Sequence, residues 1–157
     1  MNADPTFYIE IDAGHPLEAE AHIREAASAV VAAVYPLPPQ GKPWACTFRL
    51  SDDSSVRALN KSYRDKDKPT NVLSFPADES MQAPDEPYYL GDIIFAAETV
   101  RKEASAQKKT FENHLKHLAV HGLLHIYGYD HIRDEDADMM EKLEINVLAA
   151  LNIESPY

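Results

Sequence analysis

Hydrophobic and polar residues alternate along two stretches of the chain, and this pattern predicts two β-strands. Every second residue is apolar in residues 7–12 and again in residues 44–50. A period of two places the apolar side chains of a strand on one face. Two further short strands are predicted at residues 70–75, where Pro76 ends the stretch, and at residues 91–97.

Between and after these stretches, apolar residues recur at the spacing of an α-helix. Helices are predicted over residues 16–35, from residues 51–53 through Tyr63, and from Glu98 to near Gln107. A fourth helix is predicted from an N-cap at Thr110 to about Tyr127. A fifth is predicted after His131, with an apolar stripe formed by Met139, Leu143, Val147 and Leu151. Residues 76–89 contain three prolines and no periodicity, which predicts a surface loop. This order predicts an α+β fold: a single domain, residues 1–157, with a small mixed four-stranded sheet covered by helices.

Composition limits where the protein works. Cys46 is the only cysteine, so no disulfide forms within the chain and a reducing compartment fits best. We expect a cytoplasmic protein, because the first residues do not resemble a signal peptide. No apolar run approaches the roughly 20 residues that a membrane span needs, so no membrane partner is expected.

The net charge of −11 argues by itself against a nucleic-acid partner. Its distribution weakens that argument, because residues 61–68 carry four cations against two acids and residues 101–116 carry five against two. Residues 134–144 carry six acids and one lysine. Runs of this kind are typical of solvated faces, so charge does not decide the partner.

Three closely spaced histidines are the strongest chemical signal. His121 and His125 are four residues apart, so on a helix their imidazoles project from one face. Gly128 can end that helix, and the chain can then turn back to bring His131 to the same point. Three imidazoles with an open fourth position form the ligand set of a catalytic zinc. The sequence therefore predicts one zinc ion on a helix of the C-terminal half and the turn after it.

The same spacing occurs in the zinc-protease pattern H-E-x-x-H-x-x-G-x-x-H. Here Gly122 replaces the glutamate that serves those proteases as general base. Glycine cannot move a proton, so peptidase chemistry is disfavoured. A glycine between two ligands indicates close approach of backbone or substrate, or simple packing.

His114 and His117 precede His121 by seven and four residues and share its side of the helix. Either could face the metal cleft, as a support for the ligands or as a proton carrier. Alternatively, one lies at a polar edge of the helix and the other meets solvent. The general base stays open among His117, His114, Asp130 and a zinc-bound hydroxide.

Two upstream runs, together with the histidine motif, are similar to a known family. The runs are LNKSYRDKDKPTNVLSFP at residues 59–76 and LGDI at residues 90–93. With residues 121–131 they resemble the YbeY family of bacterial metal-dependent endoribonucleases, in the family's order and approximate spacing. Asn71 stands where many members have Asp, and we draw no functional conclusion from it.

The resemblance implies a single-strand-specific, zinc-dependent endoribonuclease acting in 3′-end maturation of 16S ribosomal RNA and in late-stage quality control of the 70S ribosome. It implies ribosomal RNA and the small subunit or its proteins as partners. It also implies that His121, His125 and His131 hold the zinc and that Arg64 acts with His121 in catalysis. A guanidinium suits phosphate oxygens because it forms two parallel hydrogen bonds. Without the resemblance, Arg64 would be interpreted as a surface residue that pairs with Asp65 or Asp67.

Two alternatives come from other classes of protein. One is a zinc hydrolase of amides or esters. The other is a ribosome-assembly factor in which a mainly structural zinc holds the fold and RNA is positioned but not cut. The oligomeric state is not indicated by the sequence.

Overall fold

A four-stranded mixed sheet forms the centre of the protein. The computed structural model describes residues 5–34, 43–66, 70–126 and 134–154. The strands are β1 (Thr6–Ile11), β2 (Trp44–Ser51), β3 (Val72–Pro76) and β4 (Tyr88–Ala96), in the order β1-β2-β4-β3. β1, β2 and β4 run parallel, and β3 pairs antiparallel with β4. The predicted α+β fold with a small mixed sheet is confirmed.

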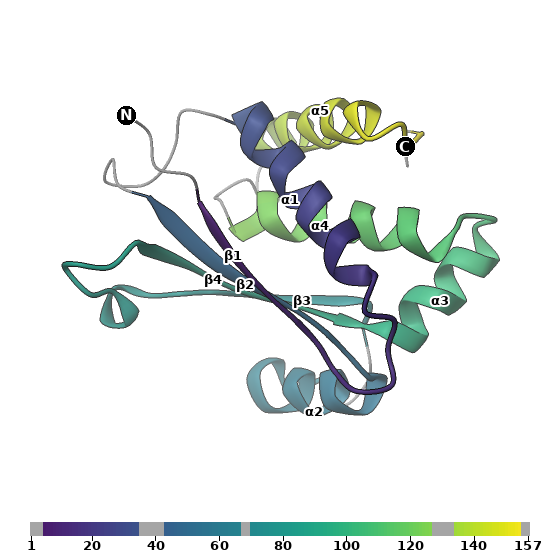
Figure 1. Ribbon diagram of the computed structural model, residues 1–157, viewed down its shortest axis with the longest axis horizontal. Coiled ribbons are helices and arrows are strands. Elements are labelled where there is room, and N and C mark those ends of the chain that lie inside the picture. Colours follow the sequence, from purple (N-terminus) through teal and green to yellow (C-terminus); the bar gives the residue numbers. More distant parts are fainter. Residues whose placement is uncertain (1–4, 35–42, 67–69, 127–133, 155–157) are drawn as a thin grey trace.

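Helices cover both faces of this sheet, in unequal number (Figure 1). The elements are α1 (Ala19–Val34), α2 (Asp53–Arg64), the short 3-10 helix η2 (Glu79–Met81), α3 (Ala97–Ala106), α4 (Phe111–Ile126) and α5 (Asp134–Ala150). α1, α4 and α5 lie on one face, and α2 lies on the other. In the part of the chain that the structure describes, no helix is both long and apolar enough to cross a bilayer.

The larger core lies between the sheet and α1, α4 and α5. α4 is central to it, because ten of its sixteen residues are buried. The buried apolar residues of α4 include Leu115, Leu118, Ala119 and Ile126, whose spacing of three, four or seven residues is that of one helix side. Strands and neighbouring helices supply the rest of this core. Their buried residues include Ile23, Phe48, Phe95, Met140 and Leu148.

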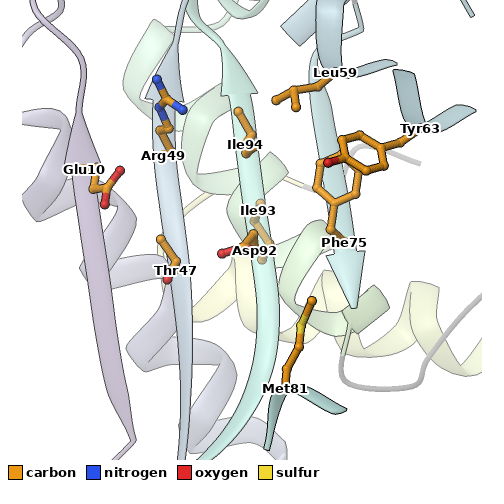
Figure 2. Close-up of a pocket in the computed structure, with 10 residues that line it drawn as sticks. All are labelled: Glu10, Thr47, Arg49, Leu59, Tyr63, Phe75, Met81, Asp92, Ile93 and Ile94. Carbon is orange, nitrogen blue, oxygen red and sulfur yellow. The ribbon is translucent and has the colours of Figure 1, made fainter. Parts of the chain in front are cut away.

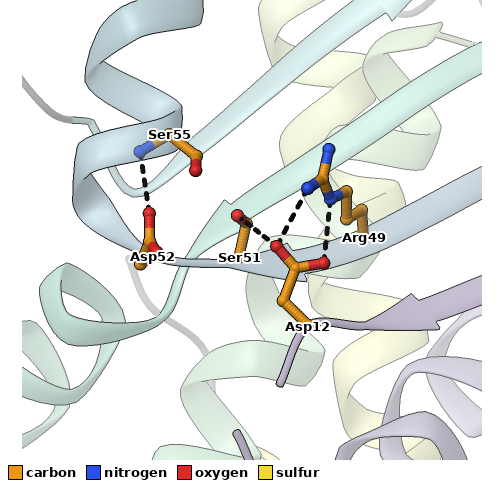
Figure 3. A network of polar contacts seen from close by, with 5 residues as sticks. All are labelled: Asp12, Arg49, Ser51, Asp52 and Ser55. Atoms are coloured by element: carbon orange, nitrogen blue, oxygen red, sulfur yellow. Dashed lines mark hydrogen bonds and ion pairs between the residues drawn. The ribbon is translucent and has the colours of Figure 1, made fainter. Parts of the chain in front are cut away.

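Local capping explains where two helices begin. The carboxylate of Asp52 accepts a hydrogen bond from the backbone N–H of Ser55 at 2.8 Å, and α2 follows directly (Figure 3). Thr110 Oγ1 accepts from the N–H of Asn113 at 3.1 Å at the start of α4. Each side chain satisfies one of the N–H groups that a helix N-terminus leaves unpaired. Both predicted starts are confirmed.

The predicted surface loop at residues 76–89 is too long, because its last two residues belong to β4. It contains η2, and β4 begins at Tyr88, three residues before the predicted start. The amide side chain of Gln82 bonds both the N–H and the carbonyl of Tyr89, at 2.8 and 2.9 Å. The Gln82 side chain thus bonds the backbone of Tyr89 as a neighbouring strand would. The alternation of apolar and polar residues could not predict this contact. The helix predicted from Pro16 likewise begins later, at Ala19.

The apolar stripe predicted for α5 is confirmed except at its first residue: Val147 is buried, and Leu143 and Leu151 pack against the core. Met139 is 54% exposed, whereas Met140 is fully buried. Val147 and Leu148 are buried on the same side. Glu144 is spaced by four residues from Met140 and from Leu148, and it is fully buried with them. The buried face of α5 therefore includes one member of the acidic run.

Candidate metal centre

α4 presents two of the predicted zinc ligands near its C-terminal end. His121 and His125 are one turn apart; His121 is half-buried and His125 is exposed. His131, Gly128 and Asp130 lie outside the described residues. Within the residues that are described, no group of three metal-binding side chains occurs. The complete three-histidine site therefore stays a prediction.

A buried carboxylate meets His121 from the C-terminal helix. Oε1 of Glu144, on α5, is hydrogen-bonded to Nδ1 of His121. Oε2 of the same carboxylate lies 3.7 Å from Nε2 of His117. The side chain of Glu144 is fully buried, and those of His117 and His121 are 16% and 30% exposed. One carboxylate thus lies between two imidazoles of α4.

This arrangement fits a metal-binding histidine. Because Nδ1 of His121 faces the Glu144 carboxylate, Nε2 is the nitrogen suited to coordinate an ion. Histidines that bind metals commonly donate their other ring N–H to a carboxylate, which fixes the ring and raises its basicity. The donors that the structure describes, His121 with His125 one turn later, therefore fit zinc.

Glu144 was not identified from the sequence. It lies in a run of acids, which is typical of a solvated surface. One signal was present: its spacing of four residues from Met140 and from Leu148 places it on the apolar side of α5. A charged residue on a buried helix face indicates a partner, because an unpaired buried charge is costly.

His114 belongs to a different contact. It is 3% exposed, and its Nε2 lies 2.8 Å from Oε1 of Glu103 on α3. Burial is the main cause that lowers the pKa of His114. One alternative from the sequence was that either His114 or His117 faces solvent. The structure instead shows both side chains largely buried. His114 joins α4 to α3, and His117 lies beside Glu144.

Gly122 lets α4 approach the sheet. A Cβ at this position would lie 3.1 Å from Cγ2 of Ile93 on β4 and 3.3 Å from Oγ of Ser74 on β3. Packing against the sheet therefore accounts for the glycine, although glycine costs a helix about 1 kcal/mol relative to alanine. The sequence had left open both packing and close approach of a substrate.

Arg64 lies away from the histidine helix. It is the last residue of α2, it is exposed, and α2 lies on the opposite face of the sheet from α4 (Figure 1). Its neighbour Tyr63 is 71% exposed and packs edge-to-face on Phe75, with ring centroids 5.4 Å apart. The structure therefore places Arg64 and the two histidines on elements of different faces, and a shared catalytic role stays a prediction.

A cleft of about 450 Å³ opens on the α2 face of the sheet (Figure 2). One side is apolar, with Tyr63 and Phe75, and the other is polar, with Arg49, Thr47 and Asp92. The residues come from four strands, α2 and η2, and several of them lie in the runs at residues 59–76 and 90–93; the strand order brings these distant segments together. The sequence analysis did not identify this cleft.

The polar groups on this face are bound to one another. Arg49 donates two hydrogen bonds of 3.0 Å to the carboxylate of Asp12, which also accepts from Ser51 at 2.7 Å (Figure 3). The bonds from the guanidinium hold the pKa of Asp12 below its usual range. The hydroxyl of Tyr89 donates to Asp92, and burial is the main cause that raises the pKa of Tyr89. Formally, the lining of the cleft carries the carboxylates of Glu10 and Asp92 and the guanidinium of Arg49, which is itself paired with Asp12.

Comparison with known proteins agrees with this fold. The family model described as Endoribonuclease YbeY matches residues 11–152. The chain belongs to the YbeY family. Two relatives described as Endoribonuclease YbeY, from Bradyrhizobium diazoefficiens and Azorhizobium caulinodans, are 54% and 49% identical over 111 and 132 residues. These matches cover 69% and 84% of the chain.

The coverage of the YbeY relatives themselves differs. The match spans 61% of the Bradyrhizobium protein and 81% of the Azorhizobium protein. Among solved structures, the solution structure of TM1509 from Thermotoga maritima is similar, with a TM-score of 0.58 at 23% identity. That similarity covers 94% of this chain and 92% of TM1509, and it supports the fold.

Proposed function

We propose that this protein is a single-strand-specific, zinc-dependent endoribonuclease. The observation that carries the proposal is the pair His121 and His125 on one turn of α4, with Nδ1 of His121 on the buried Glu144. Membership of a family described as Endoribonuclease YbeY supports the reaction type. His131, together with this pair, would complete the ligand set for one ion.

The chemistry that a zinc ion would supply here is Lewis-acid polarisation of a phosphoryl oxygen and a lowered pKa for nearby water. The protein's own residues hold and orient the reacting groups. His121 and His125 direct their rings from one helix face, and Glu144 fixes the rotation of the His121 ring. Arg64 would bind phosphate oxygens of the RNA strand from α2.

His117 is the best-placed described candidate for proton transfer. It lies next to Glu144, and its Nδ1 is buried with no hydrogen-bond partner among the described residues. His114 is less suited, because it is held against Glu103 and away from solvent. Asp130 and a zinc-bound hydroxide stay open.

The proposed substrate is ribosomal RNA, with the small ribosomal subunit or its proteins as partners. By resemblance to the family, the proposed roles are maturation of the 3′ end of 16S ribosomal RNA and late-stage quality control of the 70S ribosome. A cytoplasmic location fits the single, buried Cys46. The cations of residues 61–64, which the structure shows as exposed on α2, support contact with phosphates.

Cleavage of a labelled single-stranded RNA and of its duplex tests the proposal. We expect the zinc-loaded protein to cut the single strand in preference, to lose activity with a chelator, and to regain it when zinc is added back. His121→Ala should abolish cutting, whereas His15→Ala, a histidine in the turn before α1, should leave it unchanged. Cutting that continues after complete removal of metal would overturn the mechanism.

An assembly factor with a structural zinc is the second candidate, and it is favoured by the position of Arg64 on α2, across the sheet from the histidines of α4. It predicts binding to ribosomal particles without any RNA cleavage, in wild type and in His121→Ala alike. A zinc hydrolase of amides is less supported, because Gly122 packs on the sheet and offers no side chain to the site. A panel of peptides and esters, assayed at constant zinc, tests that class.

A further inference from the structure

Glu144 is unusual among the charged residues of this protein. Its side chain is completely buried, with 0% of its surface exposed. Its neighbours on the buried face of α5 are Met140, Val147 and Leu148. Burying a carboxylate costs several kcal/mol unless hydrogen bonds compensate for the lost water. Both oxygens of this carboxylate face α4 imidazoles: Oε1 is hydrogen-bonded to Nδ1 of His121, and Oε2 lies 3.7 Å from Nε2 of His117.

Packing alone does not account for this choice. An apolar side chain of similar volume between Met140 and Leu148 would fill the same space, and replacing buried ionic groups in this way is often neutral or stabilising. The carboxylate instead contacts the ring nitrogen that decides how His121 is oriented. His121 is also the ligand that lies deeper, while His125 is exposed.

We propose that Glu144 is a positioning residue: it holds the proton of His121 on Nδ1 and thereby directs Nε2 of that ring toward the ion. The inference rests on the proposed metal site. Glu144 would also restrain His117 through its second oxygen, 3.7 Å from Nε2. α5 thus becomes part of the metal centre, although its residues follow the histidine motif in sequence.

The carboxylate has two separable effects on His121. Its oxygen accepts the Nδ1 proton, which sets the tautomer, and its negative charge makes the ring a stronger donor to a cation. Glu144→Gln keeps an acceptor oxygen and removes the charge. Glu144→Ala removes both. The two variants therefore distinguish orientation from charge.

The first measurement is the tautomer of His121 in the metal-free protein, read from ring ¹⁵N chemical shifts at a pH where the imidazole is neutral. We expect a proton on Nδ1 in wild type and in Glu144→Gln. Glu144→Ala should show a mixture with the Nε2-protonated form. A wild-type His121 protonated on Nε2 would overturn the inference.

The second measurement is the zinc dissociation constant, obtained by competition with a chromophoric chelator. Loss of such a partner weakens metal binding by about 10- to 100-fold, and we expect this range for Glu144→Ala and a smaller loss for Glu144→Gln. Glu103→Gln is the matched control, because it alters another glutamate–histidine contact of α4, the partly buried one at His114. Its dissociation constant should stay within about twofold of wild type.

A purely structural role predicts a different pattern. It would lower the unfolding temperature of Glu144→Ala while the folded fraction bound zinc as wild type does, and that result would overturn the inference. If wild type bound no zinc, the proposed function would fail, and the His121 tautomer would still decide whether Glu144 sets the ring. If Glu144→Ala did not fold, two other results would test the inference: the His121 tautomer in wild type and the zinc dissociation constant of Glu144→Gln.

Discussion

Asn71 donates a hydrogen bond from Nδ2 to Oε1 of Glu103, 2.9 Å away. The same oxygen lies 2.8 Å from Nε2 of His114. One carboxylate thus joins the segment before β3, helix α3 and helix α4. An ionised aspartate at position 71 could not donate this bond, which gives a physical reason for asparagine at this position.

Asn71→Asp should lower the free energy of unfolding by about 1–2 kcal/mol at neutral pH, because it places two carboxylates together and removes a donor. Adding Glu103→Gln should restore at least half of the loss, since glutamine can donate to Asp and still accept from His114. Denaturant unfolding of the two single variants and the double variant measures this coupling. Additive losses would show that the two side chains do not interact.

His114 should make stability depend on pH near neutrality. Burial lowers its pKa below the ordinary 6.5, and Lys109 and His117 act in the same direction while Glu103 opposes them. The unfolded chain therefore binds a proton more readily than the folded one, so stability is complete above about pH 6.5 and falls as the pH drops through that value. Unfolding measured from pH 7.5 to 5.5 should show this decline.

His114→Gln provides the control for that titration. Glutamine can still donate to Glu103 but does not titrate, so the variant should lose less stability over the same pH range. Equal pH slopes in wild type and variant would mean that His114 does not contribute.

Gly91 has no space for a side chain. Its φ is +141°, and a Cβ there would lie 2.2 Å from the carbonyl oxygen of Phe75 on β3. Gly91→Ala should cost at least ~3 kcal/mol, because backbone strain and the clash across the β3–β4 pair add together. Thermal or denaturant unfolding measures the loss.

Gly14→Ala is the matched control, because Gly14 also has a positive φ, +90°, but nothing lies within 4 Å of its Cβ position. It should cost only the strain, about 1 kcal/mol. Similar losses at both positions would show that the contact with Phe75 does not matter.

Local signals in the sequence predicted much of the fold. The caps at Asp52 and Thr110 and the break at Gln107 are set by residues within one helical turn, so the chain itself carries them. The alternation in β1 and β2 reflects a sheet with helices on its faces. The order β1-β2-β4-β3 depends on pairings between distant segments, which periodicity does not record.

The candidate site was predicted in part for the same reason. His121 and His125 share a helix face because four residues make about one turn, and the structure places them so. Glu144 reaches His121 across 23 residues, by packing of α5 on α4, and its place in an acidic run masked its burial. The cleft beside Tyr63 likewise requires the assembled sheet.

Zinc content per chain tests the central claim most directly. After loading with zinc and removal of the excess, mass spectrometry should find one zinc per chain in wild type and in His15→Ala, and a small fraction of that in His125→Ala and His131→Ala. Full zinc occupancy in both ligand variants, or none in wild type, would contradict a metal centre built on these histidines.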